Sequence, residues 1–344
     1  MFYNILNLFV ICIIGLITIS SSKIFDYSDS IINIDTTNGT NYHVLFDQFL
    51  KDFKKIYDST EYVRRLETFT SNVNHIRLHN AQEISYKLGI NQFADMTPAE
   101  FIQYNGLQIR SIRSRGCQKQ LTVATYSDSI NWITKGAVTS VKDQGQCGSC
   151  WSFSTTGALE GLYKLTYDKL ISFSEQQLVD CSKMNSGCDG GLMDYAFNYV
   201  MENGLDDESN YPYISGITKK ANICNLTSVI INSKIANCED VEPNEVALAK
   251  AVSVQPVSVA IEADIKSFQL YKSGIYSDVK CGNNLDHGVL VVGYGSENNQ
   301  LYWLVKNSWS ENWGENGYIR ILRTIDSTST GLCGIALSAS YPIY

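Results

Sequence analysis

Histidine is scarce in this chain, and positive charge does not dominate it. Only four histidines occur among 344 residues, and 27 basic side chains face 35 acidic ones, for a formal net charge of -8. A chain with this balance lacks the basic surface that a nucleic acid requires, so we expect no nucleic-acid partner. Internal repeats and low-complexity tracts are also missing, and the 44% hydrophobic content is that of an ordinary globular protein.

Long apolar runs are limited to one, near the N-terminus. Residues 8–19 form a 12-residue apolar run that three serines follow. The run is shorter than a typical membrane-spanning helix, and small residues follow it as in a signal peptide, although no Lys or Arg precedes it. We predict a signal peptide at 1–20 and a soluble, exported remainder that is lysosomal or secreted. The alternative is a membrane anchor.

Cysteine, by contrast, is plentiful. Ten cysteines occur, and nine remain once the predicted signal peptide has been removed together with Cys12. The secretory pathway is oxidising, so these cysteines are expected to form disulfides. Since nine is an odd number, at least one cysteine has no partner within the chain.

The chain divides into two parts of different charge. Residues 1–123 carry 12 basic and 11 acidic side chains, and residues 124–344 carry 15 and 24, which gives net charges of +1 and -9. In the first part, apolar residues recur every three or four positions in 46–57 and 61–80, which predicts amphipathic helices, and Thr97 is expected to cap another. The basic segment 109–120 is predicted to be an exposed linker that proteases can cut.

The second part changes character along its length. Helical spacing dominates near 150–165 and 191–203, and strand patterns follow beyond residue 250. The predicted strands lie in 256–263, 287–295, 301–309 and 318–323. A helix-rich part followed by a strand-rich part predicts an α+β fold of two subdomains with a cleft between them.

The stretch CGSCW at 147–151 has a C-x-x-C spacing that three chemistries share. A zinc site is disfavoured because no second such pair or paired-histidine motif occurs, and a redox centre is disfavoured because no small βαβ unit is evident around it. A cysteine nucleophile needs a basic partner, and His287 is the one histidine beyond the linker. We therefore predict Cys150 as nucleophile and His287 as base, with no metal and no cofactor.

His287 has a predicted neighbour in the next strand. Its strand and the following one flank the polar loop 296–300, and folding about residue 298 places Asn307 nearly opposite His287, roughly 5 Å away. A carboxamide there would fix the tautomer of the imidazole without adding charge, whereas a lone histidine would more often be a buried core residue. Cys150 would begin a helix, whose N-terminus, together with a His287 imidazolium, favours a thiolate.

Together these residues resemble the papain-like cysteine proteases, and the likeness covers nearly the whole chain. Four blocks carry it within the second part, at 136–154, 188–197, 285–295 and 306–321. In the first part, six residues match the E-R-F-N-I-N pattern of cathepsin L-like propeptides: Glu61, Arg65, Phe69, Asn72, Ile76 and Asn80. Four more match the companion G-x-N-x-F-x-D pattern: Gly89, Asn91, Phe93 and Asp95.

The resemblance implies a fold and a domain order. The fold would be papain-like, with a helical left domain, a β-barrel-like right domain and the catalytic cleft between them. An inhibitory helical propeptide at 21–123 would run backwards through this cleft, and the mature peptidase domain would occupy 124–344.

The resemblance also implies roles for single residues. Gln144 and the backbone N–H of Cys150 would bind the oxyanion of the tetrahedral intermediate, and Trp309 would cover the contact between His287 and Asn307. The implied disulfides are Cys147–Cys188, Cys181–Cys224 and Cys281–Cys333. This leaves Cys117 and Cys238, which are either free or paired in the precursor.

The implied substrate is an extended peptide, whose backbone would pair with Gly190 and Gly191. The pocket for the second residue before the cut would be apolar, which predicts a preference for Leu or Phe over Arg. It would comprise Leu192, Met193, Ala260, Leu285, Gly288 and Ser338. Related exopeptidases narrow the cleft with a loop that carries a histidine pair, and the single histidine beyond the linker therefore favours an endopeptidase.

Four further positions are notable. Ser310 and Asn131 replace the Gly and Asp that are usual in the family. The sequons at Asn38 and Asn225 permit glycosylation.

The sequence thus predicts a monomeric cysteine endopeptidase made as a zymogen, with protein or peptide substrates and its own propeptide as inhibitor. Removal of the propeptide near residues 122–127 is expected to be driven by acid, because protonated carboxylates would weaken its attraction to the acidic mature domain. Two alternatives remain open. One is an inactive storage or binding protein of the same fold, and the other is an enzyme that transfers the acyl group to amines.

Overall fold

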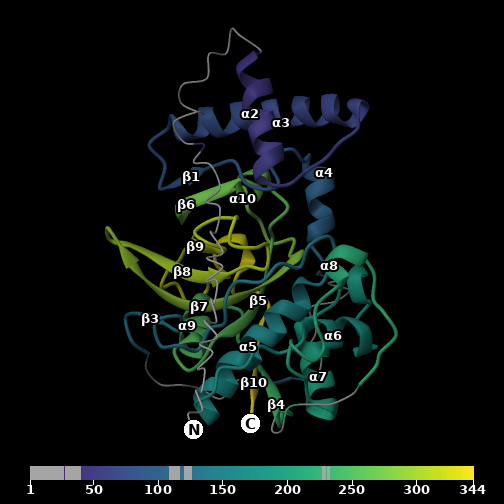
Figure 1. The fold of residues 1–344 in the computed structure, drawn as a ribbon. Helices are drawn as coiled ribbons and strands as arrows, with labels where there is room; N and C mark the ends of the chain where they lie inside the picture. The colour runs from purple at the N-terminus through teal and green to yellow at the C-terminus, as the bar shows by residue number, and fades with distance from the viewer. Residues whose placement is uncertain (1–26, 28–39, 108–116, 120–125, 227–229, 231–232) are drawn as a thin grey trace, which may run out of the picture.

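The computed structural model describes residues 27, 40–107, 117–119, 126–226, 230 and 233–344. The predicted signal peptide, the sequon at Asn38 and most of the basic linker lie outside the described residues (Figure 1). Within the described part of the chain, no helix is both long enough and apolar enough to cross a membrane.

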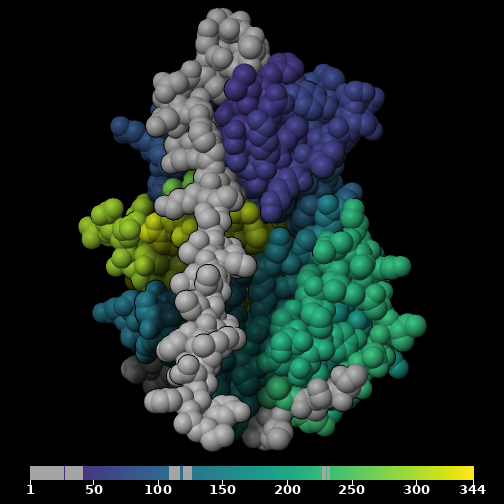
Figure 2. Space-filling model, in the orientation of Figure 1, coloured from purple at the N-terminus to yellow at the C-terminus, as the bar shows by residue number. Residues whose placement is uncertain are grey.

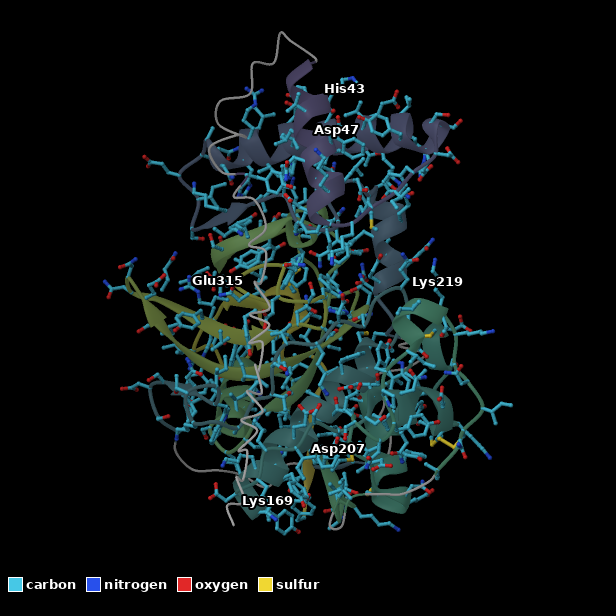
Figure 3. The ribbon with its side chains drawn as sticks, viewed as in Figure 1. His43, Asp47, Lys169, Asp207, Lys219 and Glu315 are labelled. Atoms are coloured by element: carbon cyan, nitrogen blue, oxygen red, sulfur yellow. A yellow bond between two sulfur atoms is a disulfide. The ribbon has the colours of Figure 1, made fainter. Side chains whose placement is uncertain are left out.

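Two crossed helices form a separate layer at one end of the molecule, α2 (Thr40–Asp52) and α3 (Ser59–Asn80) (Figure 1; purple in Figure 2). The exposed side chains of His43 and Asp47 lie on α2 at this outer end (Figure 3). The helix predicted at 61–80 is confirmed. The one predicted at 46–57 is wrong beyond Asp52, because the chain turns at Lys54, whose φ of 51° is left-handed.

A short helical segment leads from this layer toward the rest of the protein. It consists of α4 (Pro98–Phe101) and η1 (Ile102–Tyr104). The predicted cap is confirmed: the side chain of Thr97 accepts the Glu100 N–H while Glu100 reaches back to the Thr97 N–H.

The next part of the chain is helical, as predicted. It contains α5 (Cys150–Tyr167), α6 (Glu175–Cys181), η2 (Gly187–Asp189), α7 (Met193–Asn203) and α8 (Ser215–Thr218). Lys219, which follows α8, is exposed at the outer edge of this half (Figure 3). α5 is buried on all sides from Cys150 to Tyr163, so it lies at the centre of the protein.

The remaining chain supplies most of one mixed sheet. Its strands are β3 (Ile130–Asn131), β4 (Asn237–Asp240), β5 (Val257–Ile261), β6 (Tyr271–Tyr276), β7 (His287–Glu297), β8 (Gln300–Lys306), β9 (Tyr318–Leu322) and β10 (Ala339–Ile343). The short helices between them are α9 (Glu245–Val252), α10 (Lys266–Gln269) and η3 (Leu332–Gly334). The predicted hairpin is confirmed, since β7 and β8 pair antiparallel with Leu290 opposite Lys306, and the turn uses left-handed Asn298 and Asn299.

Two segments from before residue 124 complete the sheet. β1 (Tyr86–Leu88) pairs with β6 at one edge, and β2 (Gln118–Lys119) pairs with β4 at the other, in the order β1-β6-β9-β8-β7-β5-β10-β4-β2. The prediction of an exposed linker is therefore wrong at 117–119. There the chain joins the sheet and Cys117 is buried in a disulfide.

Two hydrophobic cores flank the sheet. One combines the helical layer with the strand-rich half, and the other lies between α5, α6 and α7. α5 packs against β7 at Gly157, where a Cβ would lie only 2.7 Å from Leu290 Cδ2. The N-terminus of α5 and the start of β7 therefore meet where the two halves join.

Candidate active site

The cysteine at the start of α5 is held by the loop before it. Cys147 is bonded to Cys188, and the Gly148 N–H donates to the Cys188 carbonyl at 2.9 Å. Cys150 is fully buried and is the one free cysteine among the described residues. Its sulfur accepts the Gly288 N–H at 3.3 Å, which places it beside the first residues of β7.

His287 begins β7 and faces β8. Its Nε2 lies 2.8 Å from Asn307 Oδ1, and the same oxygen accepts the Ser308 N–H at 2.8 Å. An amide oxygen can only accept, so Nε2 carries the ring proton and Nδ1 is the bare, basic nitrogen. Nδ1 is buried and has no hydrogen-bond partner in the described part of the protein. Trp309 stacks on the ring at 4.4 Å between centroids.

Burial keeps both of these groups neutral in this form of the protein. Burial raises the pKa of the Cys150 thiol to about 11, and it lowers the pKa of His287 to about 4 despite the bond to Asn307. The sequence predicted a thiolate and an imidazolium here. In this structure, burial of the two groups disfavours both charged forms.

Gln144 is also fully buried, and its side chain is fixed at both ends. Oε1 accepts the Ser308 hydroxyl at 2.6 Å, so the amide nitrogen points the other way. Nε2 donates to the Cys147 carbonyl at 3.0 Å and to the Tyr104 carbonyl at 2.7 Å. A peptide carbonyl from the N-terminal segment therefore already lies at this donor.

The N-terminal segment continues past Cys150. The Gly106 carbonyl accepts the Gly191 N–H at 2.9 Å. Leu107 donates to the Asp286 carbonyl at 3.0 Å and pairs in parallel with Gly191. A Cβ at Gly191 would lie 2.5 Å from Asn185 Oδ1 and 2.8 Å from the Trp151 ring, so the packing behind this residue requires glycine. Gly190 beside it has a left-handed φ of 109°.

Five of the six residues predicted to line a pocket are buried, and the sixth, Ser338, is half-buried. Leu107 packs against the apolar cluster that contains Met193, Ala260 and Leu285. Ala260 lies opposite Gly288 in the sheet and donates its N–H to the Ser338 carbonyl at 2.9 Å. A Cβ on Gly288 would lie 3.2 Å from the Met193 sulfur, and Leu192 is buried directly before Met193.

Four disulfides cross-link the described residues. They join Cys117 to Cys238, Cys147 to Cys188, Cys181 to Cys224, and Cys281 to Cys333. The first of these answers the question that the sequence left open, because Cys117 and Cys238 are paired with each other in the precursor.

Two residues at this site were not predicted from the sequence. Ser308 orients the Gln144 amide, and the Asp286 carboxylate accepts the Asn105 side-chain amide at 3.0 Å. Burial raises the pKa of Asp286 to about 7. Asp286 directly precedes His287, and Ser308 directly follows Asn307. The sequence alone does not say where the side chain of such a neighbour points.

The departures from the family pattern and the second sequon have local explanations. Ser310 has a left-handed φ of 59°, the conformation for which glycine is the usual residue. Asn131 Oδ1 accepts the Ile133 N–H at 3.0 Å, a role that an aspartate oxygen could also fill. Asn225 is exposed.

Comparison with known proteins places these features in a family. Residues 126–343 match the model of the papain family cysteine protease, and residues 46–101 match that of the cathepsin propeptide inhibitor domain. The chain is 42% identical over 350 residues to the KDEL-tailed cysteine endopeptidase CEP2 of Arabidopsis thaliana, covering 98% of this chain and 94% of that protein.

Two further relatives extend this likeness. The probable cysteine protease RD21B of Arabidopsis thaliana is 48% identical over 287 residues, which cover 81% of this chain but only 61% of that longer protein. The structure of digestive procathepsin L 3 from the larval midgut of Tenebrio molitor is similar with a TM-score of 0.79 and 41% identity, covering 88% of this chain and 99% of that one.

Proposed function

Because this chain belongs to the papain family of cysteine proteases, we propose that it hydrolyses peptide bonds with Cys150 as nucleophile and His287 as general base. A propeptide inhibitor domain precedes the protease domain, so the chain is the precursor of a cysteine endopeptidase. The relatives that cover it are named cysteine proteases and a cysteine endopeptidase. Nothing in these comparisons supports the alternative of an inactive storage or binding protein.

The bare Nδ1 of His287 is the observation that carries the proposal. Asn307 keeps the proton on Nε2, so Nδ1 is free to take the thiol proton of Cys150. The resulting thiolate attacks the carbonyl carbon of the scissile bond, and His287 returns the proton to the departing amine. Water then hydrolyses the thioester with the same histidine as base.

The negative oxygen of each tetrahedral intermediate needs fixed donors. Gln144 Nε2 and the backbone N–H of Cys150 fill this role, and the present bond from Nε2 to the Tyr104 carbonyl supports it. Release of the N-terminal segment admits water to the site. It thereby removes much of the desolvation that keeps Cys150 and His287 neutral, and the helix N-terminus at Cys150 favours the thiolate.

The pocket beside Gly191 sets the preference for substrate. Leu107 of the propeptide packs against the apolar cluster that contains Met193, Ala260 and Leu285, which supports a leucine or phenylalanine as the second residue before the cut. An arginine there would bury its charge among apolar side chains without a counter-ion.

The precursor is processed in steps. A signal peptide at 1–20 directs it into the secretory pathway, and it acts as a monomer in a lysosome or outside the cell, with glycans at Asn38 and Asn225. Acid then promotes the cut near residues 122–127, between the propeptide at 21–123 and the mature domain at 124–344. The family matches at 46–101 and 126–343 are compatible with this division.

Expression of the precursor followed by acidification tests the mechanism. Cleavage of a fluorogenic peptide is measured for the wild type and for Cys150→Ser, with His287→Ala as a second variant. We expect activity in the wild type alone, and thermal melts of the variants close to the wild type. Equal cleavage by Cys150→Ser would refute the assignment.

A further inference from the structure

The segment just before the predicted cut is joined covalently to the catalytic domain. Cys117 lies before residues 122–127, whereas its partner Cys238 lies on β4, 121 residues later. Cutting the chain at 122–127 therefore leaves Cys117 bound to β4. As long as the chain from Leu107 to Cys117 is intact, the inhibitory segment stays bound as well.

β2 is also part of the sheet. It pairs in parallel with β4, with Gln118 beside Glu239, and the other side of β4 pairs with β10. Loss of β2 would expose the backbone donors and acceptors along the edge of β4, a liability that folded proteins avoid. At the opposite edge β1 pairs with β6, where no disulfide of the described residues joins the two strands, so β1 can leave with the helical layer.

The disulfide is shielded from reductants. Cys117 is 6% exposed and Cys238 is fully buried. The Cys117 sulfur and carboxylate oxygens of Asp194 and Asp240 all lie within 4.8 Å of one another. Reduction requires attack by a thiolate, and both the burial and the two carboxylates oppose the approach of an anion.

We propose that the active enzyme retains Cys117: β2 stays on β4 through the disulfide, and the inhibitory helices leave by hydrolysis of a peptide bond between Leu107 and Cys117. This inference rests on the proposed processing. A propeptide that is cut only at 122–127 would remain tethered. Its effective concentration would be of the order of millimolar, so it would continue to occupy the cleft.

Peptide mapping of the activated wild type tests the inference. The precursor is activated at acid pH with dilute cysteine as reductant, free thiols are alkylated, and the enzyme is digested with trypsin without reduction. We expect the tryptic peptide 116–119 linked to 235–250, and we expect the pair to separate on reduction. An active enzyme in which Cys238 is alkylated, or in which residue 117 is missing, would overturn the proposal.

A double variant, Cys117→Ser with Cys238→Ser, gives the complementary result. A single cut at 122–127 should release its propeptide, so its active form lacks residues 117–119. The matched control, Cys181→Ser with Cys224→Ser, removes a disulfide within the catalytic domain and should keep the 116–119 peptide linked. If the control also loses this peptide, the tether is not specific and the proposal fails.

The outcomes distinguish this inference from the proposed function. If the wild type is never processed, the proposed function fails. The unprocessed Cys150→Ser precursor still decides the tether, because the peptide 116–119 must already be linked to 235–250 in it. If a double variant does not fold, the wild-type map decides.

Discussion

Gly106 is the position at which the propeptide fits most tightly against the catalytic domain. A Cβ there would lie 2.0 Å from the Gly148 carbonyl oxygen and 2.5 Å from Gly148 Cα, both rigid backbone atoms. Carbon–oxygen contacts in proteins are rarely closer than about 3.3 Å, so an alanine must displace the segment by more than about 1 Å. This shift breaks the bond from Gly191 to the Gly106 carbonyl and the adjacent bond from Leu107 to the Asp286 carbonyl.

The cost of Gly106→Ala follows from these contacts. Each lost hydrogen bond costs about 1 kcal/mol and the overpacking at least about 1 kcal/mol more, which sums to about 3 kcal/mol. We therefore expect the open form of the precursor to become roughly 100-fold more populated.

The rate at which iodoacetamide alkylates Cys150 at neutral pH reports this population, because the thiol reacts only when uncovered. Gly89→Ala is the matched control: its Cβ would lie 3.0 to 3.2 Å from Lys272 Cβ, Cγ and Cδ, contacts that a shift of a few tenths of an ångström relieves, so its rate should change only a few-fold. Alkylation of Gly106→Ala at the wild-type rate would refute the steric argument.

Three further outcomes are expected. Gln144→Ala should lower kcat by about 10²- to 10³-fold with little change in KM for a fluorogenic peptide, and an unchanged kcat would remove this residue from the oxyanion site. Burial lowers the pKa of His75 and His79 in the propeptide, so the closed precursor loses stability as the pH falls through their ordinary range. In a His75→Gln, His79→Gln double variant, the slope of the logarithm of the activation rate against pH should become shallower by up to about two. An unaltered slope would exclude these histidines as acid sensors. A peptide panel should show faster cleavage after Leu or Phe than after Arg at the second residue before the cut, and the reverse order would contradict the pocket assignment.

Parts of the site that depend on local pattern followed from the sequence. The helix that starts at Cys150 shows in the spacing of its apolar residues, and the β7–β8 hairpin shows in two strand patterns around a polar loop. These signals were enough to predict that Asn307 lies next to His287, because the register of a short hairpin is set by its turn.

Other features depend on contacts between distant parts of the chain. The direction of the Gln144 amide is set by Ser308, 164 residues away, and that of Asp286 by the propeptide residue Asn105 and by Ala263. No periodicity in the sequence encodes such contacts. The linker prediction failed at 117–119 for the same reason, because its composition does not reveal that β4 offers a free edge.

The sequence by itself determined the chemistry. It contains one histidine beyond the linker, His287, and a cysteine at the start of a helix, Cys150. With Asn307 in the strand that follows His287, these residues leave a single nucleophilic pair. The tertiary structure alone decided the state of that pair and the link to the propeptide. Protonation depends on how much water the folded chain excludes from Cys150 and His287, and the disulfide depends on folding Cys117 against Cys238. Both are properties of three-dimensional proximity, which residue type and spacing do not specify.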